Sequence, residues 1–132
     1  MPSEKKKIYD LEERTAVFGE EIISFVRKVP KNEITKPIIS QLIRSGTSMG
    51  TNYCEADCAE SRKDFEHKIG ICKKEAKETR YWIRMLAQAV PELKEELKAL
   101  WKEANELHLI FIAIVKKSRI NSKRKEDLDI EN

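Results

Sequence analysis

Basic side chains recur at helical spacing in the third quarter of the chain. They are Lys73, Lys77, Arg80 and Arg84, and their four-three-four spacing places them on one face of a helix. A row of cations at this spacing can follow the phosphates of a nucleic acid. Three carboxylates, Glu66, Glu75 and Glu78, are interleaved with the row and would pair with it on a solvated face. Both interpretations stay open on the sequence.

A second candidate is Arg44, which directly precedes a run of small residues. Gly46 and Gly50 lie four residues apart and so share one helical face. Each costs a helix interior roughly 1 kcal/mol relative to alanine. Glycines tolerated at this cost predict that another helix packs closely against them. Arg44, beside such a crossing, is either half of an interfacial ion pair or a ligand contact.

The residues that could hold a metal do not form a familiar motif. Cys54, Cys58, Cys72 and His67 are thiolate and imidazole donors, but their spacing matches no paired-cysteine zinc site, and cysteine often fills core gaps. Asp64-Phe-Glu-His67 is half of a di-iron pattern, and the other histidine, His108, has Asn105 at the matching offset. We also find no nucleophile elbow and no phosphate-binding glycine loop. The sequence predicts a non-enzymatic protein with no metal and no cofactor.

The bulk composition fits one small helical domain. The chain has 132 residues, 37% of them charged, and a formal net charge of only +3. Three cysteines give no disulfide framework, which favours a reducing cytoplasm. No apolar run reaches the roughly 18 to 20 residues that span a bilayer. We therefore expect a cytoplasmic protein without a membrane anchor.

Capping residues and prolines divide the chain into four helices. Asp10, Thr35 and Ser61 are the expected N-caps, while Pro30 and Pro91 end the first and third helices. The last helix has a seam of Leu97, Leu100, Ala104, Leu107, Phe111 and Ile114. Short connections predict an all-α, up-down-up-down antiparallel four-helix bundle over residues 10–119. Residues 1–9 form a basic N-terminal arm, and residues 120–132 a charged, disordered tail.

Residues 109–115 are apolar without interruption, which is more than one bundle seam requires. Ile110, Ile112 and Val115 are therefore expected at an interface between subunits. The alternative is a wide core-facing surface at one end of the bundle.

Several distributed motifs between Tyr9 and Arg119 occur together. They are Arg44-Ser-Gly-Thr-Ser with Gly50, Asn52 and Glu55-Ala56, then Lys63-Asp64-Phe65, then Lys74-Glu-Ala76 with Glu78-Thr-Arg-Tyr-Trp82. With these motifs the chain resembles the four-helix bundle proteins encoded in intervening sequences of bacterial large-subunit ribosomal RNA genes. A related branch is the accessory protein of diversity-generating retroelements.

The resemblance implies a homopentameric, barrel-like ring with a central channel. It also implies nucleic-acid contacts at Arg44, Lys73, Lys77, Arg80 and Arg84, since the retroelement relatives bind nucleic acid and a reverse transcriptase. Our leading interpretation is a homo-oligomer that binds structured RNA, DNA or an RNA-protein complex, with a ribosomal or reverse-transcriptase-like partner. The alternative is a protein-protein adaptor with no nucleic-acid contact.

Overall fold

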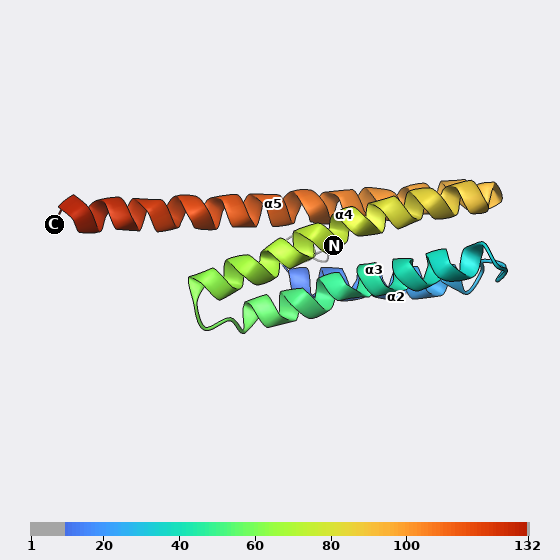
Figure 1. Ribbon diagram of the computed structural model, residues 1–132, viewed down its shortest axis with the longest axis horizontal. Coiled ribbons are helices and arrows are strands. Elements are labelled where there is room, and N and C mark those ends of the chain that lie inside the picture. Colours follow the sequence, from blue (N-terminus) through green and yellow to red (C-terminus); the bar gives the residue numbers. More distant parts are fainter. Residues whose placement is uncertain (1–9, 132) are drawn as a thin grey trace, which may run out of the picture.

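The computed structural model describes residues 10–131, and side chains through residue 130. Within this part of the chain all regular secondary structure is helical (Figure 1). The elements are α2 (Leu11–Val26), α3 (Thr35–Asp57), α4 (Arg62–Ala89), the short 3₁₀ helix η1 (Pro91–Leu93) and α5 (Lys94–Glu131). No described helix is both long enough and apolar enough to cross a membrane. The predicted basic arm at residues 1–9 lies outside the described residues.

Two of the three expected N-caps close their helices as predicted. The Asp10 carboxylate accepts the N–H of Glu13 at 3.0 Å, and the Ser61 hydroxyl accepts the N–H of Asp64 at 3.0 Å. The start of α3 is different, because Thr35 is already helical and Asn32 does the capping. The Asn32 side-chain oxygen accepts the N–H groups of Ile34 and Thr35, each at 2.9 Å. An Asx turn thus replaces the expected threonine cap.

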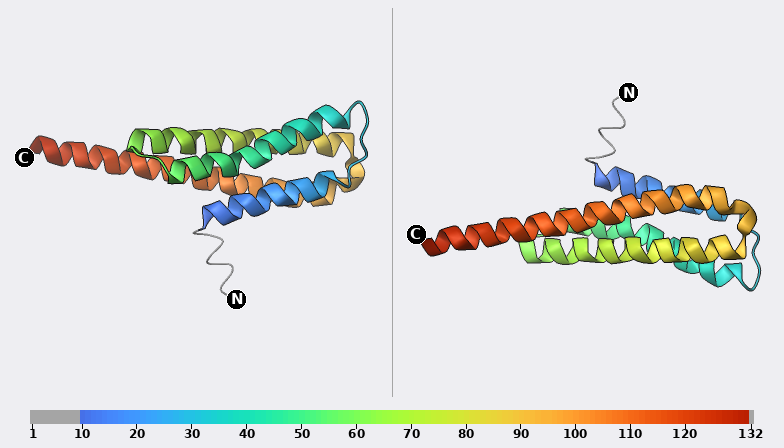
Figure 2. Two further views of the ribbon diagram at one scale, coloured as in Figure 1. Left: turned by 90° about the horizontal axis from the view of Figure 1, so that it is seen from below. Right: turned by 90° about the horizontal axis from the view of Figure 1, so that it is seen from above.

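The four α-helices run alternately up and down, as the sequence predicts (Figures 1 and 2). Helices α3 and α4, α4 and α5, and α2 and α3 pack against one another extensively, whereas α2 and α5 touch much less. The core between them contains fully buried Phe18, Ile22, Leu42, Ile83 and Phe111. The bundle is therefore tightly packed on three sides and open on the fourth.

The two glycines of α3 lie at the crossing with α2. A Cβ on Gly46 would lie 2.2 Å from Cδ1 of the buried Ile22, and one on Gly50 would lie 3.3 Å from the Thr15 hydroxyl. Gly19 of α2 faces Thr47 and the Gly46 carbonyl in the same region. Gly46 and Gly50 thus lie where α2 and α3 come close together, the place at which the sequence predicts close helix packing.

Charged side chains span the open side between α2 and α5. Arg14 binds Glu103 through two N–H groups at 2.8 Å each and also binds Glu106 at 2.7 Å. Its hydrogen bonds, led by the one to Glu103, raise the pKa of Arg14 above its ordinary value. At the other end of the same seam, Lys28 pairs with Glu96. Ion pairs thus bridge α2 and α5 at both ends of this side.

The last helix continues well past the predicted boundary at residue 119. Helix α5 is 38 residues long and projects beyond the start of α4, whereas the sequence predicted disorder from residue 120 (Figure 2). The chain contains no glycine or proline after Pro91 to end the helix. Six of the twelve residues 120–131 are strong helix formers, namely Lys123, Arg124, Lys125, Glu126, Leu128 and Glu131. The projecting segment is exposed on nearly all sides.

Candidate nucleic-acid interface

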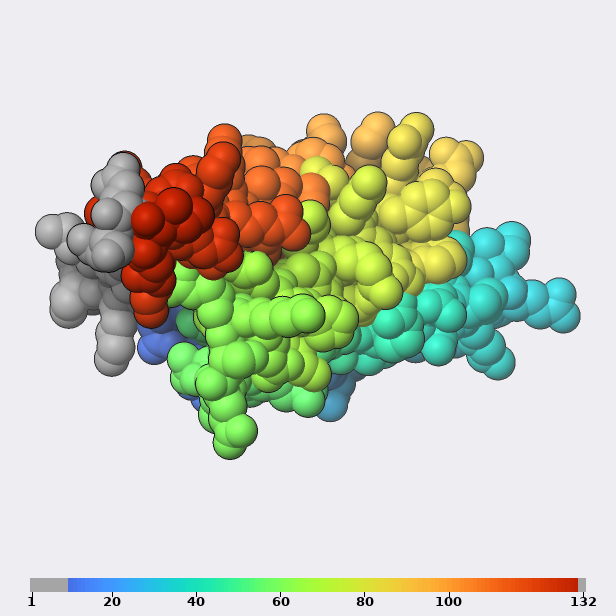
Figure 3. Space-filling view, turned by 60° about the vertical axis from the view of Figure 1, so that its left-hand side comes forward, coloured from blue at the N-terminus to red at the C-terminus, as the bar shows by residue number. Residues whose placement is uncertain are grey.

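The predicted basic row lies along α4 where this helix packs against α5. Figure 3 shows a face on which the two helices lie side by side, α4 in green to yellow and α5 in orange to red. Lys77 and Arg84 are exposed, while Lys73 and Arg80 are half-buried. The four cations follow the buried seam residues Cys72, Ala76, Thr79 and Ile83, each by one position. This offset of about 100° turns the row away from the core and toward the α5 side.

Arg80 is the best-anchored member of the row. Its Nη1 donates to Asn105 Oδ1 at 2.6 Å, and its guanidinium carbon lies 5.7 Å from the centre of the Trp101 ring. Both partners are on α5, so Arg80 links the two helices. Its Nε is buried and has no acceptor among the described residues.

His108, one turn beyond Asn105 on α5, reports the electrostatic potential of this surface. Burial lowers the pKa of His108 most, and the nearby charges of Arg80, Lys73 and Lys77 lower it further. Three members of the row therefore act on one imidazole from α4. Their charges act on the surface where α4 packs beside α5, which contains Lys73, Lys77, Arg80 and Arg84 of α4 and Trp101, Asn105 and His108 of α5. We call this surface the α4–α5 seam.

The interleaved carboxylates do not neutralise the row. Glu75 and Glu78 pair with Arg44 of α3, and Glu66 accepts a hydrogen bond from Ser118 at 2.8 Å. Among the described residues, no carboxylate lies within ion-pair distance of Lys73, Lys77, Arg80 or Arg84. The local pairing that the sequence left open is absent from this part of the chain.

Arg44 lies on the other flank of α4, between α3 and α4. Its Nη1 donates to Glu75 at 2.9 Å, its Nη2 to Glu78, and its Nε to Gln41 at 3.1 Å. The hydrogen bond to Glu78 raises the pKa of Arg44, and the same bond lowers the pKa of Glu78. Of the two roles that the sequence allowed, the structure places Arg44 in the interhelical ion pair. Its prediction as a nucleic-acid contact stays a prediction.

The three predicted interface residues of α5 occupy three different environments. Ile112 is 38% exposed, Ile110 is half-buried against the core, and Val115 is only 5% exposed. Val115 rather than Ile114 continues the buried seam, because a straight α-helix drifts away from a strict 3.5-residue repeat. The expectation that Val115 faces another subunit is therefore wrong for this fold. Leu109 and Ile112 form the exposed apolar surface here.

The thiol groups do not converge into one site. Cys54 and Cys58 are exposed near the end of α3, and Cys72 is buried with its thiol 3.5 Å from the Met49 carbonyl. Burial raises the pKa of Cys72 to about 12. No group of three or more His, Cys, Asp or Glu residues within the described chain is arranged to hold a metal ion.

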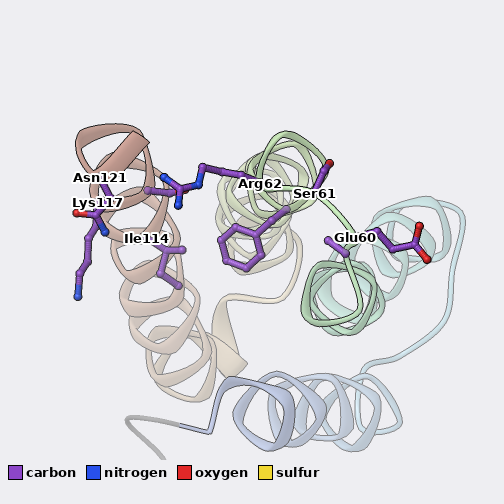
Figure 4. Close-up of a pocket in the computed structure, with 9 residues that line it drawn as sticks. Glu60, Ser61, Arg62, Ile114, Lys117 and Asn121 are labelled. Atoms are coloured by element: carbon purple, nitrogen blue, oxygen red, sulfur yellow. The ribbon is translucent and has the colours of Figure 1, made fainter. Parts of the chain in front are cut away.

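A surface hollow of about 530 Å³ lies at the start of α4 beside α5 (Figure 4). Phe65 and Ile114 are apolar residues that line it, and Arg62 extends across it toward Asn121 (Figure 4). Lys117 and Glu60 point away from it (Figure 4). The hollow has few convergent polar groups and lies outside the row at Lys73 to Arg84.

Sequence reasoning missed Trp101 and the role of Asn105 in this surface. Trp101, Asn105, His108 and Ile112 recur at four-three-four spacing, each directly after a buried seam residue of α5. This is the same offset that revealed the basic row on α4. The same rule applied to α5 would have predicted the residues that face the basic row across the candidate interface.

Four antiparallel helices around one apolar core place the molecule in the class of antiparallel four-helix bundles. The 23S rRNA-intervening sequence protein family matches residues 7–113, and the chain belongs to that family. A crystal structure of a protein of unknown function, from the S23 ribosomal protein family of Bacteroides thetaiotaomicron, is similar to it. The two share 30% sequence identity with a TM-score of 0.71, over 80% of this chain and 97% of the other. No curated protein gives a significant match.

Proposed function

We propose that the protein is a non-enzymatic, cytoplasmic homo-oligomer that binds nucleic acid, first of all structured RNA, along the α4–α5 seam. The observation that carries this proposal is the basic row on α4, which pairs with no carboxylate of the described residues because Glu75 and Glu78 pair with Arg44 instead. The charges of Arg80, Lys73 and Lys77 add to burial in lowering the pKa of His108. Unpaired cations on a surface release counterions when they bind phosphates, and this release drives non-specific affinity. A family defined by ribosomal RNA intervening sequences is consistent with an RNA or ribosomal partner.

Self-association would multiply the effect of the row. A net charge of +3 is modest for one chain, but each copy in a ring would add its own basic row. The exposed Leu109 and Ile112 on α5 offer an apolar surface for such contacts. A homopentamer, which the resemblance implies, is our proposed form.

The first test is the salt dependence of RNA binding by a neutralised variant. In Lys73→Gln/Lys77→Gln/Arg84→Gln, three exposed or half-exposed cations are lost while Arg80 keeps its contacts with α5. We expect weaker binding of a labelled ribosomal RNA hairpin by fluorescence anisotropy. The slope of log affinity against log salt should fall by about 1 for each phosphate contact removed.

A matched control removes three exposed cations near the end of the bundle at which α2 connects to α3 and α4 connects to α5. This variant is Arg27→Gln/Lys36→Gln/Lys94→Gln. This variant has the same net charge, so its affinity and slope should stay near those of the wild type. A fourth protein, Arg44→Gln, tests the predicted contact at that residue separately from the row. Unchanged affinity and slope in the row variant, or equal losses in row and control variants, would remove the α4–α5 seam as the binding surface.

The alternative is a protein-protein adaptor, and the same exposed apolar surface favours it. A partner that stays bound to the purified protein after nuclease treatment supports the adaptor. If the partner is a reverse transcriptase or a ribosomal protein, mutation of Ile112 should release it while mutation of the basic row should not.

A further inference from the structure

Trp101 is a large aromatic residue on the surface of the α4–α5 seam. Its side chain is 40% exposed although it borders the buried Leu100 and Ala104 positions. The guanidinium of Arg80 packs on it, with the central carbon 5.7 Å from the ring centre. One part of the indole is therefore backed by the protein, and another part is open to a ligand.

The arrangement of Arg80 holds this ring in a defined environment. Arg80 Nη1 donates a hydrogen bond to Asn105 Oδ1 at 2.6 Å, and Asn105 lies one turn after Trp101 on α5. No carboxylate pairs with Arg80 within the described chain, and its Nε has no acceptor there. The guanidinium beside the indole is therefore not paired with a carboxylate of the described residues, so an anionic ligand at this place would meet an unpaired cation.

The surroundings of this pair have the two parts of a single-strand binding surface. Such surfaces combine cations that follow the backbone with aromatic rings on which bases stack. Lys73 and Lys77 lie along the same side of α4 as Arg80 and supply the cationic part. Bases within a duplex already stack on their neighbours on both faces, so an indole can stack only on an unpaired or splayed base.

We infer that Trp101, backed by Arg80, stacks on an unpaired base, so that the ligand of this seam is a single-stranded or loop segment of RNA. This inference rests on the proposed nucleic-acid binding and adds the class of nucleic acid. The lysine row then contacts the phosphates that flank the stacked base.

Intrinsic fluorescence tests the contact directly, since the chain has only two tryptophans. Trp82 lies on the other flank of α4, where its indole N–H donates to Glu78 at 3.2 Å. In a Trp82→Phe background, Trp101 is the only tryptophan, and excitation near the red edge of the absorption band selects its emission over that of the three tyrosines. We expect a 12-nucleotide oligouridylate to quench this emission, and a 12-base-pair RNA duplex at equal phosphate concentration to leave it unchanged.

Affinity measurements complete the test. Trp101→Ala should weaken binding of the oligouridylate by about fivefold to a hundredfold, with the salt slope unchanged because indole carries no charge. Trp101→Phe keeps an aromatic ring and should recover most of the affinity. Circular dichroism of each variant checks that the bundle remains folded, and duplex affinity provides the internal reference.

The outcomes separate this inference from the function on which it rests. If neither RNA binds to the wild-type protein, the proposed function fails, and the stacking contact fails with it. If both RNAs bind but Trp101 emission stays constant, or Trp101→Ala binds oligouridylate as well as the wild type, the inference alone is overturned. Equal quenching by duplex, or an emission change on dilution without RNA, would also overturn it, the latter by placing Trp101 between subunits.

Discussion

At the scale of single residues, Gly46 sets how closely α2 and α3 approach. Any larger residue must displace Cδ1 of Ile22, which would lie 2.2 Å from the new Cβ. Ile22 is fully buried, so it has little room to adopt another rotamer. The glycine is retained at a cost in helix propensity because the crossing has no space for a methyl group.

This packing predicts that Gly46→Ala destabilises the wild-type protein but stabilises a protein that already carries Ile22→Val. Gly46→Ala alone should lower the free energy of unfolding by about 1 kcal/mol, because overpacking exceeds the gain in helix propensity. With Ile22→Val the clashing Cδ1 is gone, and the same substitution should become stabilising. Chemical denaturation of the four proteins measures both effects.

Gly70 is the control for this cycle, because a Cβ there meets no atom within 4 Å. Gly70→Ala should stabilise the protein by about 1 kcal/mol in either background. If Gly46→Ala destabilises equally with Ile22 and with Val at position 22, the contact with Cδ1 is not the cause.

Some residue-level features follow from the sequence, and others depend on contacts between helices. Gly46 and Gly50 could be predicted, since their spacing fixes a shared face and their cost requires a reason. The partners of Glu75 and Glu78 could not, because local spacing offers cations on α4 while Arg44 reaches them from α3. Such a competition is decided by the packing of two helices and not by either helix alone.

At the scale of elements, α4 and α5 build the candidate interface together. The row on α4 was visible in the sequence, and its helical spacing fixed the face on which it lies. Trp101 and Asn105 lie on α5 and face this row. Their part in the surface can be recognised only from the packing of the two helices, which places Arg80 beside them. Similarly, the apolar run at 109–115 hid which position continues the seam, and the structure assigns it to Val115.

The packing of α4 against α5 predicts that the stability of the protein depends on pH through the protonation of His108. Burial and the charges of Arg80, Lys73 and Lys77 hold its pKa below the ordinary value near 6.5. Between the folded and the unfolded pKa, the unfolded chain binds more protons, so stability rises with pH across that window and is flat above it. Phosphates that neutralise the three cations would reverse the effect and raise the pKa of His108.

RNA binding should therefore take up a proton and tighten as the pH falls below about 6.5, by about two- to tenfold between pH 7.5 and 5.5. His108→Gln should abolish this tightening, measured by anisotropy at constant salt. The matched control is His67→Gln, since His67 is the chain's other histidine and is exposed near the start of α4. Equal pH dependence in wild type and His108→Gln would show that His108 does not couple protons to binding.

At the scale of the whole molecule, one face of α5 carries apolar groups that the described bundle does not cover. Leu109 is 55% exposed and Ile112 lies on the same outer side of the helix. Their exposure is the structural support for the proposed ring. Helix α5 also projects past the bundle, so a neighbouring subunit could contact it along a greater length than the bundle itself.

Two substitutions in α5, at the exposed Ile112 and at the buried Val115, can distinguish an effect on self-association from an effect on folding. Ile112→Asn should reduce the mass seen by analytical ultracentrifugation while leaving the helical signal intact. Val115→Asn buries an amide in the core and should instead lower the free energy of unfolding by about 2–4 kcal/mol. A wild-type protein that is monomeric at every concentration would contradict the ring.

The ion pairs between α2 and α5 should make one end of the bundle more sensitive to ionic strength than the other. The two ends differ: Arg14 is almost enclosed with Glu103, whereas Lys28 and Glu96 are about half exposed. Mobile ions screen an exposed pair far more than an enclosed one. Rising salt should thus weaken the Lys28–Glu96 contact before the contacts of Arg14. If the proposed RNA binding is titrated with salt, curvature in the plot would then report the loss of this ion pair, and only the straight part of the plot would count phosphate contacts.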